Sequence, residues 1–253
     1  MLKKAILLIL IILGCISNSN AQYEQFYHEI GIMGGPTFLK SDFGERGDVE
    51  NFTKNSGFSI GGFYYISAVE NFHSLRENFK ARIELSYSKS NLQHYGKYVD
   101  PELTSTFAKQ LRAMKGKTTM VNAGLQVEFY PWKIDDYNRG GSDFSPYLSG
   151  GFQVSNYTTE VKSDLGKLGS PATTPRKYIG AYKNDDGIAF SLTAGFGTRY
   201  KIGDYHALIA DFRAQYYFSD WVDGLNPNNK VYTENKSNDW SATINFGYVY
   251  YIN

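Results

Sequence analysis

Polar and apolar residues alternate along eight stretches of this chain, and each stretch is long enough to cross a lipid bilayer as a tilted strand. The stretches are residues 29–38, 58–66, 80–92, 119–131, 144–157, 188–202, 208–219 and 240–252. Successive side chains of a strand point to opposite faces, so a period of two gives one apolar and one polar face. Membrane strands need about 9 to 11 residues, whereas strands of soluble proteins average about 5 to 6. Period and length together predict an all-β fold, an eight-stranded antiparallel transmembrane β-barrel with long extracellular loops.

The connections between these stretches alternate in length. Long connections follow the odd-numbered strands, at residues 39–57, 93–117, 158–187 and 220–238. Shorter ones follow the even-numbered strands, at 67–79, 132–143 and 203–207. Outer-membrane barrels have long outer loops and short periplasmic turns, so the pattern predicts an outer-membrane barrel with both termini in the periplasm. The alternative is a soluble lipocalin-like barrel, which would have mixed loop lengths and an apolar face turned inward.

Composition agrees with a strand-rich membrane protein. Aromatic residues make up 16% of the chain, with 25 Gly and only 7 Pro. The mean hydropathy of −0.40 excludes a bundle of membrane helices, but a barrel needs apolar residues only at alternate positions. With Lys+Arg 26 against Asp+Glu 25, the chain lacks the basic excess of a nucleic-acid-binding protein.

Residues 1–21 have the three parts of a secretory signal peptide. Lys3 and Lys4 precede an apolar run at 5–13, and Ser19 and Ala21 form a small-x-small cleavage site. The run is too short to cross a bilayer as a helix. We therefore expect residues 22–253 to form the barrel, without disulfides. An alternative stays open, because residues 12–15 resemble a lipobox in which Cys15 would be acylated.

The polar faces of the strands carry charges of both signs. The predicted lumen charge network is Glu29, Lys80, Arg82, Glu84, Glu128, Arg199, Asp211 and Arg213. An eight-stranded barrel is just wide enough inside for its own side chains, and opposite charges there can pair. We expect a plugged lumen, with a narrow ion path or proton-linked site as the alternative.

The last stretch ends in a pattern typical of the signal that the barrel assembly machinery recognises. In the order polar, any, Gly, any, any, aromatic, any, apolar, the four matching residues are Asn245, Gly247, Tyr250 and Ile252. The pattern falls at the end of the predicted final strand. We therefore expect this machinery to be a partner during insertion, with outer-membrane lipid as the surroundings.

Several segments resemble the uncharacterised outer-membrane β-barrel proteins of flavobacteria and their relatives, over essentially the whole mature chain. The segments are residues 28–31, 41–46, 111–117, 170–178 and 219–227. The resemblance implies the same location in the cell envelope. It brings no known activity, since architecture does not fix function.

The sequence shows no catalytic or metal site, and we predict no cofactor and no enzyme. No pair of its four His residues has the spacing of metal ligands. His94, with Ser90 and Asp100 nearby in sequence, is the candidate catalytic residue of an outer-leaflet enzyme. Asp220, Asp223 and Asn226 could hold Ca²⁺, but these residue types more often hold turns.

The long loops contain apolar and aromatic residues, so we expect them to fold into a cap or to bind a partner. The docking candidates are Arg112, Lys115, Trp221 and Asp223. The second loop is basic, through Lys109, Arg112, Lys115 and Lys117, so it either meets lipopolysaccharide phosphates or is simply solvated.

The leading hypothesis is a non-enzymatic barrel that docks onto an envelope protein, as an accessory subunit of a secretion or barrel-assembly machine. A narrow pore or small-ligand receptor is the alternative, and an outer-leaflet enzyme is the third hypothesis.

Overall fold

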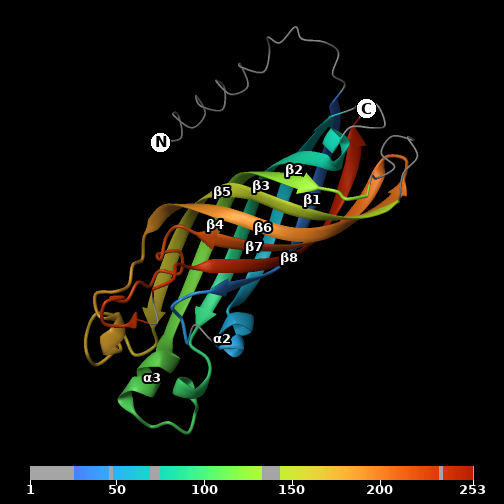
Figure 1. Cartoon of the computed structure of the whole chain (residues 1–253). Helices are drawn as coiled ribbons and strands as arrows, with labels where there is room; N and C mark the ends of the chain where they lie inside the picture. The colour runs from blue at the N-terminus through green and yellow to red at the C-terminus, as the bar shows by residue number, and fades with distance from the viewer. Residues whose placement is uncertain (1–25, 46–47, 69–74, 133–142, 234–235, 253) are drawn as a thin grey trace.

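The alternating stretches form one closed antiparallel barrel of eight strands, in which each strand pairs with the next and β8 closes onto β1 (Figure 1). The strands are β1 (Phe26–Lys40), β2 (Ser56–Ala68), β3 (Phe79–Gln93), β4 (Met114–Phe129), β5 (Phe144–Ser163), β6 (Asp186–Gly203), β7 (His206–Tyr217) and β8 (Trp240–Ile252). The predicted fold class is confirmed.

The computed structural model describes residues 26–45, 48–68, 75–132, 143–233 and 236–252. The predicted signal peptide at 1–21 and the alternative lipid site at Cys15 lie outside these ranges. No helix in the described ranges is long and apolar enough to cross a lipid bilayer.

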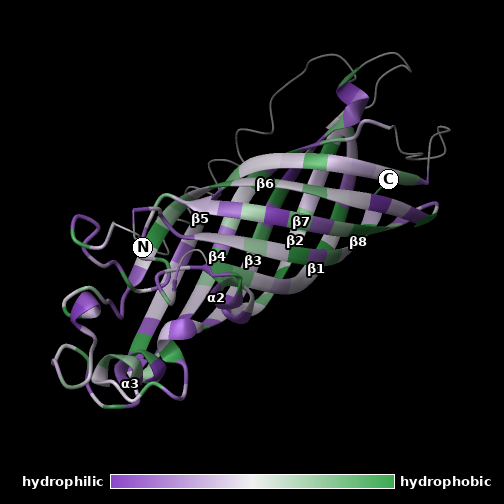
Figure 2. Cartoon of the chain, turned by 60° about the horizontal axis from the view of Figure 1, so that its bottom comes forward, coloured by the Kyte–Doolittle hydropathy of each residue, from purple (hydrophilic) through white to green (hydrophobic). Residues whose placement is uncertain are grey.

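Exposed and buried residues alternate along the strands, as the period of two predicts. Hydrophobic and hydrophilic residues alternate along the same strands in Figure 2. In β3 every second residue is exposed, and these residues include Ile83, Leu85 and Tyr87. The residues between them, such as Arg82 and Glu84, point into the barrel and are buried. The barrel therefore has an apolar outer wall and a polar interior, the reverse of a soluble barrel.

The long connections all lie at one end of the barrel, which we call the loop end (Figure 1). The first strand begins and the last strand ends at the opposite end, which we call the turn end. The described helical elements are α2 (Val49–Lys54), η1 (Leu75–Asn78), η2 (Lys97–Val99), α3 (Thr106–Ala113) and η4 (Arg176–Tyr178). All but η1 belong to the loop end. Ser105 caps α3 by accepting a hydrogen bond from the Ala108 N–H.

Two strands extend at least five residues farther toward the loop end than the sequence predicts, whereas the others differ there by at most two residues. β4 begins at Met114 rather than 119, and β5 ends at Ser163 rather than 157. Met114 pairs directly with Ser163. The outward residues of this extension are polar, with Lys115 and Lys117 in β4, so the apolar half of the alternation is missing there. Backbone pairing continues where the wall no longer needs to be apolar.

Candidate functional site

The interior of the barrel near the turn end is filled by three charged side chains. Glu29 accepts a hydrogen bond from Lys80 Nζ and forms an ion pair with Arg199, whose Nη2 lies 2.7 Å from Glu29 Oε2. All three are buried. The guanidinium of Arg199 lies 4.8 Å from the centre of the Tyr65 ring. Ion-paired side chains and the Tyr65 ring thus occupy the barrel interior at this level.

A second group of charges surrounds Arg82 in the middle of the barrel. Arg82 Nη1 lies 2.8 Å from Glu128 Oε1, and Arg82 Nε lies 3.4 Å from Glu84 Oε2. Arg213 forms ion pairs with Glu84 at 2.6 Å and with Asp211 at 3.3 Å. The structure thus brings all eight residues of the predicted network into two adjoining groups, with acids and bases in equal number.

Tyrosine side chains complete the network, and the sequence analysis missed them. The hydroxyls of Tyr65 and Tyr130 donate to Glu128 at 2.8 Å and 2.6 Å, and the hydroxyl of Tyr147 donates to Asp211 at 3.1 Å. Tyr65 and Tyr147 stand at inward positions of their strands, and that position was the available signal. Tyrosine is abundant on both faces of this barrel, so its residue type alone does not reveal the role.

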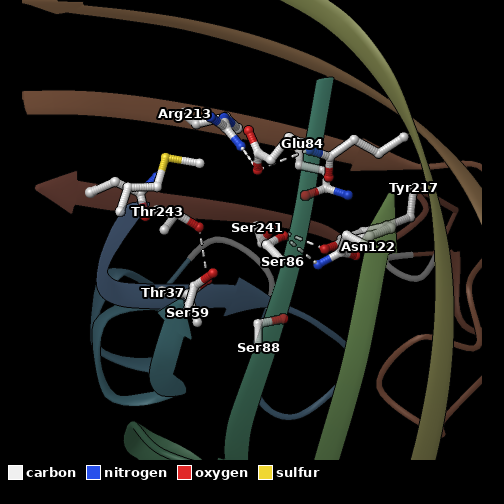
Figure 3. Close-up of a pocket in the computed structure, with 14 residues that line it drawn as sticks. Thr37, Ser59, Glu84, Ser86, Ser88, Asn122, Arg213, Tyr217, Ser241 and Thr243 are labelled. Atoms are coloured by element: carbon white, nitrogen blue, oxygen red, sulfur yellow. Dashed lines mark hydrogen bonds and ion pairs between the residues drawn. The ribbon is translucent and has the colours of Figure 1, made fainter. Parts of the chain in front are cut away.

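On the loop-end side of the charges, small polar side chains line the interior around a cavity of about 20 Å³ (Figure 3). Such a volume holds about one water molecule. Thr37 and Thr243 lie 3.0 Å apart across the β1–β8 seam, and Ser155 donates to Asn122 at 2.6 Å. These contacts close the interior rather than shape a channel.

A cap of loop residues covers the loop end; it comprises the described residues of 41–55, 94–113, 164–185 and 218–239. Each of the four loops contributes buried side chains to one apolar cluster, which also includes strand residues. The loop members are Phe43, Leu111, Leu168, Tyr178, Val222 and Leu225. The Tyr178 hydroxyl donates a hydrogen bond of 2.9 Å to the Asp42 carbonyl oxygen, which connects the third loop to the first. The cap is therefore a packed unit rather than a set of independent loops.

Three of the four docking candidates are used inside this cap. Arg112 donates to the carbonyl oxygens of Asp100 and Leu103, which shapes the second loop. Trp221 is partly buried, with Lys183 Nζ 4.1 Å from its ring centre. Asp223 is fully buried and accepts hydrogen bonds from the backbone N–H groups of Asp42 and Leu225. Lys115, in contrast, lies on the outer wall.

Of the suggested calcium ligands, Asp223 is the one whose hydrogen bonds the structure gives. In the described ranges, no three His, Cys, Asp or Glu side chains are placed to share a metal ion. The oxygens of Asp223 instead accept from backbone N–H groups, as in the turn-holding alternative. Burial, together with the charge of Asp42, raises the pKa of Asp223 well above its ordinary value.

His94 lies inside the cap rather than at an open rim. Its ring centre is 5.1 Å from that of Phe43 and 5.4 Å from that of Tyr178. Its Nδ1 accepts a hydrogen bond from the Gly44 N–H at 2.8 Å. Nε2 has no hydrogen-bond partner in the described part of the chain, so neither Ser90 nor Asp100 forms a catalytic pair with it there. Burial and the charge of Lys177 lower the pKa of His94 to about 3.

The pKa of His94 predicts that acid loosens the cap. An exposed His titrates near 6.5, so below that pH the opened cap binds a proton that the folded cap does not. Lowering the pH from 7 to 5 should therefore reduce the contribution of His94 to the free energy of unfolding of the cap by about 2 kcal/mol. Asp223 acts in the opposite direction, because its raised pKa favours the protonated form in the folded cap.

Comparing the wild type with His94→Asn isolates the histidine, since the Asn oxygen can still accept from the Gly44 N–H. The ratio of Gly44 amide exchange at pH 5 to that at pH 7, corrected for its intrinsic pH dependence, should be larger in the wild type than in the variant, because Asp223 contributes equally to both. The same pH profile in both proteins would contradict the prediction.

The residues of the predicted assembly signal lie in β8, which closes the barrel. Asn245 points inward and donates to Asp211 Oδ1 at 3.1 Å, while Tyr250 and Ile252 are exposed on the outer wall. A Cβ at Gly247 would lie 2.7 Å from Ile209 Cγ1 and from the Ile32 carbonyl oxygen. Glycine is thus required there by close packing, whatever role the segment has in assembly.

Comparisons with known proteins identify the fold. No family model matches the chain, and no curated protein sequence matches it. Among solved structures, a major outer membrane protein from Thermus thermophilus has a TM-score of 0.51 and 12% identity, covering 90% of this chain and 99% of that one.

Neisserial surface protein A (NspA) has a TM-score of 0.41 and 12% identity, with 89% and 96% coverage of the two chains. Ail, the attachment invasion locus protein of Yersinia pestis, has 0.42 and 12%, with 90% and 99% coverage. The Thermus likeness, together with the closed sheet, shows that this chain has the fold of outer-membrane β-barrels.

Proposed function

We propose that this protein is a closed outer-membrane barrel that presents its loop cap to a protein partner in the cell envelope. The observation that carries the proposal is the shared apolar cluster of the cap, to which all four loops contribute. Loops that pack against one another present a preformed surface, and a partner that binds it pays less ordering entropy. The barrel then serves as the anchor.

The location follows from the outer wall. Exposed apolar side chains surround the barrel, such as Leu125, Phe152 and Leu192 at 46%, 53% and 54% exposure. A soluble protein would not expose such a band to water. Long loops are on the outside of outer-membrane barrels, so we place the loop end outside the cell and both termini in the periplasm. The β8 residues then reach the barrel assembly machinery from the periplasmic side.

The second loop offers the best contact surface for a partner. Tyr98, Leu103 and Phe107 are exposed at 50%, 40% and 47%. Exposed aromatic residues are enriched in the centres of protein interfaces. A secretion or barrel-assembly machine would provide such a partner, with this protein as an accessory subunit. We assign no reaction to the cap, because His94 Nδ1 already accepts from the Gly44 N–H and its ring packs against Phe43 and Tyr178.

The proposal is tested by crosslinking in intact cells, followed by purification of the barrel from detergent-solubilised membranes. A stoichiometric partner should be recovered with the wild type and lost with Tyr98→Ala/Phe107→Ala. Val49→Ala/Val231→Ala removes two other exposed apolar side chains of the cap and should retain the partner. Recovery of the barrel alone from wild-type cells would contradict the proposal.

A second function, as a small-ligand receptor, is favoured by a pocket of about 440 Å³ in the cap. Its walls include the rings of Tyr95, Phe107 and Tyr232, with Arg176 and Lys177 beside them. The size is within the usual range of ligand pockets, and the lining suits a flat apolar molecule with an acidic group. Binding of 1-naphthoate, weakened by Arg176→Ala and not matched by neutral 1-naphthalenemethanol, would support this function.

The other form of the second hypothesis, a narrow pore, predicts conductance. A planar bilayer containing this barrel is instead expected to show no stable open channel, because ion pairs fill the interior and the cap cluster closes the loop end. Single-channel recording across a range of voltages measures this directly. A reproducible conductance step from pure, folded protein would contradict the closed lumen.

A further inference from the structure

We propose that a lysine-lined groove on the outer wall binds the phosphate groups of an outer-leaflet glycolipid. The groove lies near the loop end, where residues of β3, β4 and β5 meet Lys54 of α2 and Tyr95 of the second loop, and Tyr95 separates it from the cap pocket described above. It has a volume of about 450 Å³, and Lys54, Lys115, Lys117 and Lys162 line it. This inference does not depend on the proposed docking function.

The groove begins where the apolar part of the wall ends. Going toward the loop end, the last exposed apolar residues of the wall are Tyr87 in β3 and Val121 in β4. The next outward positions are Lys89 in β3, and Thr119 and then Lys117 in β4. The outward residues thus change from apolar to basic at once in β3 and after one Thr in β4, whereas β5 passes through Asn156, Thr158 and Glu160 before Lys162.

Strand register brings the lysines together. Lys115 of β4 stands opposite Lys162 of β5, and Lys117 stands opposite Glu160. Asn91 of β3 is paired with Lys117 on the other side. Like charges placed directly opposite each other destabilise a sheet, so the Lys115–Lys162 pair has a cost that a bound anion would relieve.

The positive charge of the groove is only partly neutralised by the protein. Lys115 pairs with Asp164 at 2.5 Å, and Lys54 pairs with Glu50 at 2.6 Å. Lys117 and Lys162 have no ion pair within the described part of the chain, although the Glu160 carboxylate also lines the groove. These two ammonium groups are available to an anion.

The distance of the groove lysines from the hydrocarbon layer indicates which anion they meet. A strand tilted by about 45° climbs roughly 2.3 Å per residue, so Lys117 lies about 9 Å beyond Val121. The headgroup layer of a bilayer extends about 5 to 8 Å beyond the hydrocarbon on each side. Lys117 thus lies just beyond the headgroup layer, and the Lys115–Lys162 pair lies farther out. Their long side chains can extend back along the wall, so the three ammonium groups can reach phosphates at the outer edge of the headgroups. A molecule anchored in the adjacent leaflet enters such a groove from the side.

Binding can be measured with the full-length mature protein in mild detergent, titrated with phosphorylated lipid A and followed by native mass spectrometry. Each basic residue near an anionic lipid surface contributes about fivefold to binding. Lys115→Ala/Lys117→Ala/Lys162→Ala should therefore lower the affinity by about tenfold or more. The matched control is Lys109→Ala/Lys167→Ala/Lys230→Ala, which removes three exposed lysines of the cap and should keep the affinity within about twofold.

Three further measurements separate binding of the glycolipid phosphate from binding of free phosphate and control for misfolding of the variant. Lipid A treated with phosphatase should bind like the groove variant, and millimolar inorganic phosphate should not displace the glycolipid. Lys117→Gln/Lys162→Gln keeps the side-chain length and should show an intermediate loss, with folding checked by heat-modified gel mobility. Equal binding by the wild type and the groove variant, equal loss in the control, or full displacement by inorganic phosphate would overturn the proposal.

Discussion

Replacing Arg82 with methionine is expected to lower the free energy of unfolding of the barrel by about 3–5 kcal/mol. Arg82 is completely buried and lies within 4.0 Å of three carboxylates, those of Glu84, Glu128 and Asp211. Glu84 and Asp211 would keep Arg213 as a partner. Glu128 would keep only tyrosine hydroxyls, so a buried negative charge would lose its cation. The penalty comes from that uncompensated charge.

Urea unfolding of the protein in lipid vesicles gives the free-energy difference. Arg176→Met removes an exposed guanidinium from the cap and should change stability by less than about 1 kcal/mol. The double variant Arg82→Met/Glu128→Gln removes both partners and should recover part of the loss. If Arg82→Met were as mild as Arg176→Met, the interior would have to be wet enough to solvate Glu128, and the closed lumen would be wrong.

Replacing Leu125 with arginine is expected to cost about 2–4 kcal/mol. Leu125 is the middle one of the outward β4 residues between Val121 and Phe129, and its side chain is 46% exposed. In water an exposed Leu→Arg change is nearly neutral or favourable. In a bilayer the same position lies near the midplane, where a guanidinium must be dehydrated or must thin the membrane around it.

The matched control for Leu125→Arg is Thr119→Arg, at an outward position of the same strand beyond the apolar wall. That change should cost at most about 1 kcal/mol, because the charge reaches the interface. Unfolding by guanidinium chloride in lipid vesicles gives the change in the free energy of unfolding for both variants. Equal costs at the two positions would show that the wall does not face hydrocarbon.

The architecture could be predicted because a membrane barrel repeats one simple rule. Each strand residue is either on the wall or in the interior, so a period of two assigns both the fold and the lumen charges. Arg82 and Asp211 were predicted from this rule, and the structure places them 3.9 Å apart although they lie on β3 and β7. Which charge pairs with which was not predictable, since strand tilt and stagger decide that.

The cap was harder to predict, because its contacts join segments far apart in the sequence. His94 is placed by Phe43 and Tyr178, and Asp223 is placed by the backbone of Asp42. No periodicity links these positions. Apolar loop residues did indicate folded loops, but residue type alone could not separate a docking side chain from a structural one. Residue type predicts docking roles for Trp221 and Asp223, and the structure uses both inside the cap.

Spin labels along β4 test the central claim, that an apolar wall faces lipid around a closed interior. Cysteines would be introduced one at a time from Met120 to Val127, leaving out Gly124, and the labelled protein would be reconstituted in vesicles. Collision with oxygen, which dissolves in lipid, should be high at Val121, Ala123, Leu125 and Val127, and low between them. Collision with a water-soluble nickel chelate should be low throughout. High accessibility of the outward positions to the nickel chelate would contradict the account.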